Sequence, residues 1–275
     1  MTEATFLIFA AACYLVGAAA YGAYLFLRRP PLAAVGRFAA WAAVLTHTAA
    51  IGLHCAATHR APFATPGEAL SASAWAIALS YVVLEALKKP RPTALGAVAL
   101  PAAFLCLFAG AFLGAARPAA VHTVPLLSSR LTSLHILALL LAFGLLVLAF
   151  GCAALYLTQH RLLKQKKLVG GLFGRLPPLV TLDELAFSLV AYAFPLLTVG
   201  LAAGVVEALT GSLGTGWAAD PMVLTSVVTW LVYGAYLALH LLARWRGPRA
   251  NYLLLGGLIA AFVTYFIPST AHRFG

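Results

Sequence analysis

Histidine is the residue type in this sequence that could most readily carry out chemistry or bind a metal. The chain has eight histidines and only seven acidic residues, and several of the histidines lie inside long apolar stretches. An ionisable side chain inside such a stretch is costly to bury and is therefore a candidate functional residue. His47 and His54 are seven residues apart, so a helix would place them on one face, and His240 lies near the end of a later stretch. For His54 and His160 we expect only a hydrogen bond to a neighbouring helix.

The pattern of histidines favours haem over zinc as the ligand. Zinc is usually held by three or four side chains with help from cysteine or carboxylate groups. The four cysteines form neither a CxxC nor a CxxCH pair, so they are expected to be buried thiols. Haem needs only one or two axial imidazoles in an apolar pocket. A proton relay would require carboxylates within the spans, where the sequence has only Glu85 and Glu207, both near span ends.

A second group of polar residues is expected at the outer surface of the membrane, at the start of one apolar stretch and after the end of another. His135 begins one stretch and His272 follows the last one, and neither position requires a histidine for packing. Cationic side chains suit the propionates of haem. The candidate residues expected on this side are His135, His272, Trp217, Asp220, Arg130 and Arg273.

The elements that must position these residues are membrane-spanning helices. The composition is 63% hydrophobic and 9% charged, with a mean hydropathy of +0.96, whereas soluble domains have about 25% charged residues. About 20 apolar residues cross the hydrocarbon layer as a helix. The sequence predicts an all-α, polytopic membrane protein with a single domain over residues 1–275. The eight predicted spans are 4–27, 37–57, 68–87, 94–115, 131–158, 185–209, 223–243 and 251–268.

Basic residues predict the orientation of the bundle. Of the 18 Lys and Arg residues, 14 follow the first, third, fifth and seventh spans. Basic connectors collect on the cytoplasmic side, so both termini are predicted to lie outside. Because the basic residues lie at the ends of the spans, the net charge of +11 does not indicate a nucleic-acid partner, and the expected surroundings are a lipid bilayer. We expect a bacterial cytoplasmic (inner) membrane. The first residues lack a basic segment, so the first span is not expected to be a cleaved signal peptide.

One connector contains a helix-start signal of its own. Thr181 and Glu184 have the spacing of a capping box, with Thr181 as the N-cap residue. The preceding Pro177 and Pro178 favour an extended chain. A helix is therefore predicted to begin at Thr181 and to run into the sixth span.

Several of these segments together resemble the cytochrome c assembly family, in particular its CcsA/HemX-like haem-handling membrane proteins. Residues 214–221 resemble a reduced form of the family's tryptophan-rich WWD signature, with Trp217 retained and Met222-Val223 where the family has Lys-Glu. The other similar segments, in chain order, are residues 59–63, 68–70, 163–167, 177–182, 229–233, 245–247 and 269–274. The resemblance covers nearly the whole chain.

The resemblance implies a protein that binds or translocates haem b in c-type cytochrome biogenesis. Haem would be presented at the outer face between His135 and His272, beside Trp217 and Asp220. Its implied partners are an apocytochrome c or a periplasmic-facing assembly subunit, and its implied role is haem handling, at most as part of a cytochrome c synthase.

The resemblance also implies that His47 and His240 are ligands of an internal haem. At about 1.5 Å of rise per residue, the two differ in depth by roughly 9 Å.

Two other classes of function remain open from the sequence. One is a HemX-type membrane regulator or scaffold of haem biosynthesis that transfers no haem, with the basic connector 161–175 as its contact surface. The other is a secondary transporter, although paired Gly- or Pro-broken helices in two matching halves are not visible. An absorption spectrum of the purified protein separates the first of these from haem handling.

Overall fold

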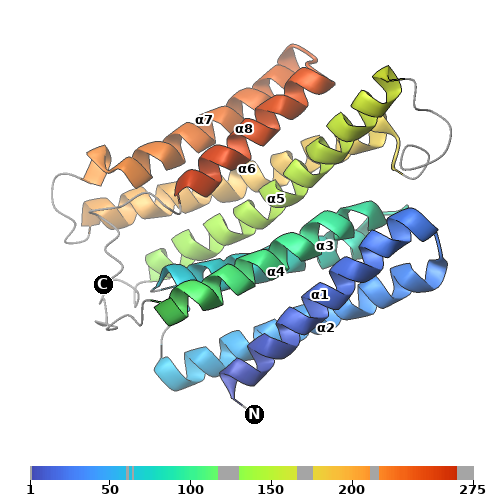
Figure 1. The fold of residues 1–275 in the computed structure, drawn as a ribbon. Coiled ribbons are helices and arrows are strands. Elements are labelled where there is room, and N and C mark those ends of the chain that lie inside the picture. Colours follow the sequence, from blue (N-terminus) through green and yellow to red (C-terminus); the bar gives the residue numbers. More distant parts are fainter. Residues whose placement is uncertain are drawn as a thin grey trace.

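The protein is a bundle of helices. The computed structural model describes residues 2–59, 62–63, 65–116, 130–165, 176–210 and 217–264, and this part of the chain contains no strand. Its elements are α1 (Glu3–Leu27), α2 (Pro30–Thr58), α3 (Pro66–Leu87), α4 (Thr93–Ala116), α5 (Arg130–Lys164), α6 (Leu179–Thr210), the 3₁₀ helix η3 (Trp217–Ala219), α7 (Pro221–Leu242) and α8 (Pro248–Thr264) (Figure 1).

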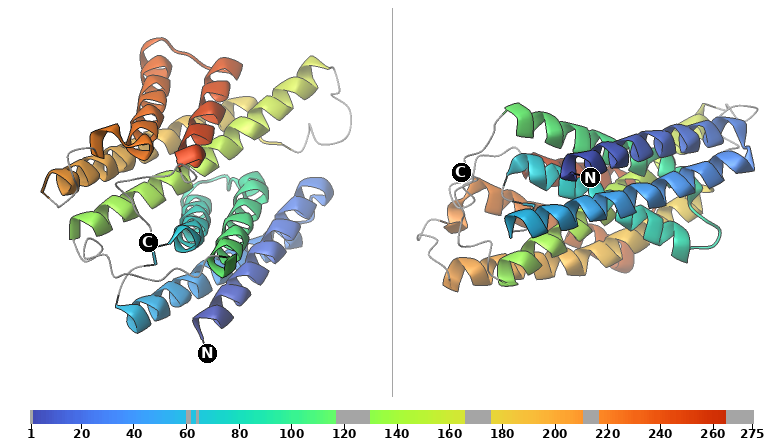
Figure 2. Two further views of the ribbon diagram at one scale, coloured as in Figure 1. Left: turned by 60° about the vertical axis from the view of Figure 1, so that its left-hand side comes forward. Right: turned by 90° about the horizontal axis from the view of Figure 1, so that it is seen from below.

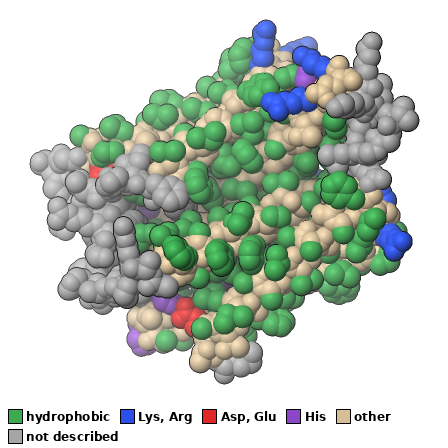
Figure 3. All heavy atoms as spheres, in the orientation of Figure 1, with side chains coloured by type: hydrophobic (Ala, Val, Ile, Leu, Met, Phe, Trp, Pro, Cys, Tyr) green, Lys and Arg blue, Asp and Glu red, His purple; other side chains and the backbone are tan. Residues whose placement is uncertain are grey.

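The helices have the length and composition of membrane spans. Seven helices, α1 to α7, have at least 18 residues and a strongly apolar window, and α8 is a shorter apolar helix of 17 residues. Large apolar side chains such as Phe38 and Ile8 lie on the outer surface of the bundle, where hydrophobic atoms dominate the face shown in Figure 3. The chain is a polytopic helical membrane protein, as the sequence predicted.

Some helices begin or end outside their predicted bounds. Helix α2 begins at Pro30 and α5 continues to Lys164. The predicted N-cap role of Thr181 is wrong, because α6 begins at Leu179 and Thr181 lies within its first turn. The reason is local: the backbone N–H of Leu182 donates to the carbonyl of Pro178 at 3.1 Å, and proline is well tolerated at a helix start.

The bundle consists of two halves that follow the order of the chain. In one half α1 packs against α2 and α4, and α3 packs against α4; in the other α5 packs against α6 and α8, and α7 packs against α6 and α8. The halves meet where α3 and α4 contact α5 (Figures 1 and 2). Consecutive helices are antiparallel, so their termini gather at two ends of the bundle. We call the end where α1, α3, α5 and α7 begin the outer end, and the opposite end the inner end.

Basic side chains lie towards the inner end. Figure 3 shows Lys and Arg side chains at that end, with one His side chain beside them, whereas the Asp and Glu side chains visible on this face lie at the opposite end. Among the residues whose side chains the structure describes, those at or near the inner end are Arg28, Arg29, Arg37, Lys88, Lys89, Arg91, Arg161, Lys164, Arg244, Arg246 and Arg249. This polarity agrees with the distribution from which the sequence predicts a cytoplasmic inner end.

Small residues and tyrosines bring the helices close together. A Cβ atom added to Gly67 would lie 2.7 Å from the carbonyl oxygen of Gly110, so only glycine permits this approach of α3 to α4. Towards the inner end, the buried Tyr21 hydroxyl of α1 donates to both carboxylate oxygens of Glu85 on α3, at 3.1 and 3.0 Å. Arg37 of α2 lies 3.7 Å from the same carboxylate. A buried acid is thus partnered from two other helices.

Candidate functional site

His135 packs into a notch on α6 near the outer end. Its Nδ1 atom lies 2.7 Å from the carbonyl oxygen of Gly200. One turn further along α6, a Cβ atom added to Gly204 would lie 2.7 Å from both Nδ1 and Cε1 of the ring. The absence of a side chain at Gly204 therefore makes room for the imidazole. Although no packing reason for a histidine at this position was evident from the sequence, the ring packs against α6.

The Gly200 contact determines which nitrogen of His135 is protonated. A backbone carbonyl only accepts hydrogen bonds, so Nδ1 must carry the proton and donate. In the neutral ring Nε2 then holds the lone pair with which an imidazole binds a metal. A backbone carbonyl that accepts from the other ring nitrogen is the usual arrangement behind metal-ligating histidines. The Glu207 carboxylate, on the same helix as both glycines, also interacts electrostatically with this ring.

Residues 217–220, which precede α7, are held at the start of that helix by hydrogen bonds. Asp220 is the N-cap residue of α7: its Oδ1 atom accepts from the backbone N–H of Met222 at 2.9 Å, and the residue is only 2% exposed. The backbone N–H of Asp220 donates to the carbonyl of Trp217 at 3.1 Å. Together these bonds fix the 3₁₀ turn that carries the partly exposed Trp217. Asp220 therefore acts on Trp217 through the backbone.

The remaining predicted residues of the outer group are not described in the same detail. His272 and Arg273 lie outside the described residues. Arg130 is the first residue of α5, and its side chain is not described. The described part of the outer group therefore comprises His135 near the start of α5 and Trp217 and Asp220 immediately before α7, all at the outer end.

His47 is fully buried in the half formed by α1 to α4, and both of its ring nitrogens are engaged. Nδ1 lies 3.0 Å from the hydroxyl of Tyr14 on α1, and Nε2 lies 3.1 Å from the hydroxyl of Ser71 on α3. The ring faces the interior of the bundle, as expected. A metal could reach either nitrogen only after one of these hydrogen bonds had broken.

His240 lies in the other half, near the inner end of α7. Its ring stacks on Phe187 of α6, with centroids 4.3 Å apart, and contacts Tyr236 one turn away. Its Nδ1 atom is buried and has no hydrogen-bond partner within the described part of the chain. Asp183, which accepts from the side-chain amide of Asn251 at 3.2 Å, is the acidic group that acts on this ring.

The structure therefore gives the two interior histidines separate surroundings. His47 contacts α1 and α3, whereas His240 contacts α6 and its own helix. Sequence reasoning did not identify the partners that create these surroundings, such as Tyr14, Phe187 and Gly204. No short sequence motif predicts these partners, because each contact joins residues from different helices.

The eight apolar α-helices of the described residues, with histidines inside the bundle and at its outer end, define a polytopic helical membrane protein. The family model described as "Cytochrome C assembly protein" matches residues 64–271, which is more than half of the chain. The chain belongs to this family. The family resemblance expected from the sequence is confirmed.

Two curated relatives are similar to this chain over most of their length. The chain is 28% identical over 252 residues to a cytochrome c biogenesis protein CcsA of Guillardia theta, covering 85% of this chain and 83% of the relative. It is 25% identical over 303 residues to the CcsA protein of Gloeobacter violaceus, covering 91% and 89%. No solved structure matches the chain significantly.

Proposed function

We propose that this protein handles haem in the biogenesis of c-type cytochromes, as a multi-pass protein of a bacterial cytoplasmic membrane. Haem is its cargo and is presented at the outer end between His135 and His272. The family match and the CcsA relatives support the role in cytochrome c biogenesis. The histidine geometry supports the more specific role.

The observation that carries the proposal is the hydrogen bond from His135 Nδ1 to the Gly200 carbonyl. It fixes the tautomer in which Nε2 is the coordinating nitrogen, before any haem arrives. The close fit of the ring against Gly204 limits its rotation. An axial ligand held in this way loses little conformational entropy when it binds iron.

Trp217, Arg130 and Arg273 complete the proposed outer site. Trp217 would provide an aromatic face for the macrocycle, and its 3₁₀ turn is held by the buried cap residue Asp220. The two arginines, which are next to or near the histidines in sequence, would pair with the propionates of haem b.

An internal haem site is the second part of the proposal, and the described contacts favour His240 over His47 as its ligand. His240 has a buried nitrogen without a hydrogen-bond partner in the described structure. His47 would have to give up Tyr14 or Ser71. The proposed acceptor at the outer end is an apocytochrome c or a periplasmic-facing assembly subunit, since haem held there is open to the space beyond the membrane.

The test is an absorption spectrum of the full-length protein purified from haem-replete cells. The proposal predicts a Soret band that weakens or shifts in His135→Ala and His272→Ala, with partial recovery when imidazole fills the vacated coordination position. A protein without a Soret band under these conditions would support the alternative, a HemX-type regulator or scaffold of haem biosynthesis. A spectrum and a level of cytochrome maturation that both survive the double substitution would refute the outer site.

A further inference from the structure

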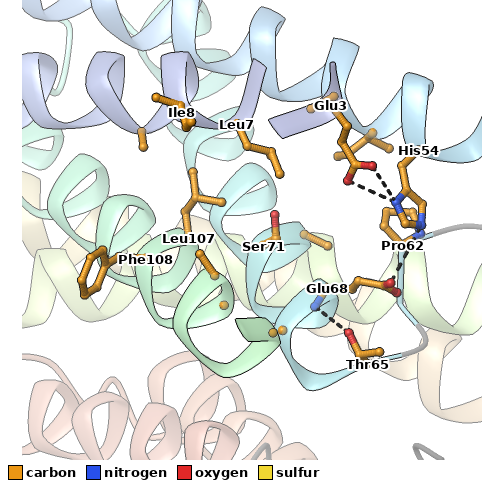
Figure 4. A pocket seen from close by; sticks show the side chains of 18 of the residues that line it. Glu3, Leu7, Ile8, His54, Pro62, Thr65, Glu68, Ser71, Leu107 and Phe108 are labelled. Atoms are coloured by element: carbon orange, nitrogen blue, oxygen red, sulfur yellow. Dashed lines mark hydrogen bonds and ion pairs between the residues drawn. The ribbon is translucent and has the colours of Figure 1, made fainter. Parts of the chain in front are cut away.

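A cavity opens between α1, α2, α3 and α4 near the outer end, away from the proposed haem site. Its volume is about 420 Å³. Most of its walls are apolar, and they include Leu7 and Ile8 of α1 and Phe104, Leu107 and Phe108 of α4. The polar lining gathers at one end, where Figure 4 shows Glu3, His54 and Glu68 converging from three different helices.

The cavity is open to the lipid side of the bundle. Ile8 is 71% exposed and Phe108 is 62% exposed, although both line the cavity. Since the surfaces of α1 and α4 face hydrocarbon in a membrane, a lipid molecule could enter sideways between these two side chains. Further towards the inner end a close contact between Gly17 and Leu100 brings α1 and α4 together and limits the depth of the opening.

The polar end is built from hydrogen-bond acceptors. His54 Nδ1 lies 3.1 and 3.2 Å from the two carboxylate oxygens of Glu3, and a carboxylate accepts, so Nδ1 donates. In the neutral ring Nε2 is then an acceptor. His54 is only 8% exposed, and its Nε2 atom is buried without a hydrogen-bond partner in the described structure. The nearest acidic neighbour of this atom is Glu68, with which it forms an ion pair only when the ring is protonated.

The spacing at this end suits a group with several donors. Nε2 of His54 lies 3.9 Å from Oε1 of Glu68, too far for a direct hydrogen bond. One donor group can contact both atoms at normal hydrogen-bond distances of about 2.8–3.0 Å. A metal ion is a poorer fit, because the His, Cys, Asp and Glu side chains of the described residues form no cluster able to hold one. A primary ammonium group carries three donors and a positive charge, which matches carboxylate acceptors.

We propose that this cavity binds phosphatidylethanolamine, with the primary ammonium between His54, Glu3 and Glu68 and an acyl chain along the apolar wall of α1 and α4. The location supports a lipid rather than a soluble amine, because the polar end lies at the level of the lipid headgroups and the opening faces the bilayer. The proposal is independent of whether the protein handles haem.

The test is native mass spectrometry of the delipidated, full-length protein, titrated with single phospholipids in detergent. Phosphatidylethanolamine should bind about tenfold more tightly than phosphatidylcholine, whose quaternary ammonium has no N–H donor, because a charge-assisted hydrogen bond contributes at least that factor. The double substitution Glu3→Gln/Glu68→Gln should remove the difference. Glu184→Gln, an exposed change of the same kind at the inner end, should preserve it.

A steric variant tests the apolar wall separately. Ala11→Phe fills the cavity and should weaken phosphatidylethanolamine binding, whereas Ala12→Phe places the same ring on the exposed side of α1 and should not. Equal affinity for the two lipids in the unmodified protein would overturn the proposal. So would selectivity that survives the double glutamine substitution, or displacement of the lipid by an equal concentration of free ethanolamine.

Discussion

The imidazole of His135 and the carbonyl of Gly200 form a 2.7 Å hydrogen bond that joins the second turn of α5 to α6. This bond assigns the Nδ1 proton and leaves Nε2 as the basic nitrogen. A backbone carbonyl of α6 therefore orients the candidate haem ligand, and this orientation depends on how closely α5 and α6 approach.

That dependence can be tested at Gly204. Replacing Gly204 by Ala puts a methyl group 2.7 Å from two ring atoms of His135, so the ring must move and the haem spectrum should shift. Gly22→Ala is the matched control, because an added Cβ at Gly22 meets nothing within 4 Å. Absorption spectra of both variants make the measurement. Identical spectra for the two would separate His135 from haem binding.

The interior histidines should respond differently to substitution. His47→Ala removes hydrogen bonds to Tyr14 and Ser71, so it should destabilise the fold by about 1–3 kcal/mol and leave the bound haem unchanged. His240→Ala should reduce the haem content of the interior. Thermal unfolding together with haem content per protein distinguishes the two effects. Loss of haem from His47→Ala at unchanged melting temperature would contradict this assignment.

The buried acid near the inner end should contribute to stability. Tyr21→Phe removes the hydroxyl that donates to both oxygens of Glu85, and loss of a hydrogen bond to a charged group costs about 1.5–3 kcal/mol. We therefore expect a lower melting temperature in detergent. Tyr252→Phe, at a half-exposed ring on α8, serves as the control. Equal melting temperatures for the two variants would show that the Tyr21–Glu85 contact contributes nothing.

The orientation of the bundle can be measured with reporter fusions. A reporter attached after Gly275 should be active outside the cytoplasm, and one inserted between Lys89 and Pro90 should be active in it, because basic connectors stay on the cytoplasmic side. A cytoplasmic signal from the Gly275 fusion would reverse the assignment of the two ends, and with it the side on which His135 lies.

The sequence was sufficient to predict the helices but not their contacts. Apolar stretches of about 20 residues identify spans regardless of neighbours, so the eight α-helices in the described part of the chain were predicted. His54 was correctly expected to form a hydrogen bond to a neighbouring helix. The identity of its partner, Glu3, was not predictable, because the two are 51 positions apart. The error at Thr181 arose because a capping pattern records local preference, whereas the carbonyl of Pro178 accepts the bond that begins α6.

The family match begins at residue 64, so α1 and α2 lie outside the matched region. Both helices nevertheless supply partners to α3: Tyr21 bonds to Glu85, and His47 bonds to Ser71. Without them, a carboxylate and a hydroxyl of α3 would face hydrocarbon, where unpaired polar groups are costly. Helices α1 and α2 thus shield the polar side chains of α3 from lipid. A fragment that began at the family boundary would expose Glu85 and Ser71 to the bilayer without these hydrogen-bond partners.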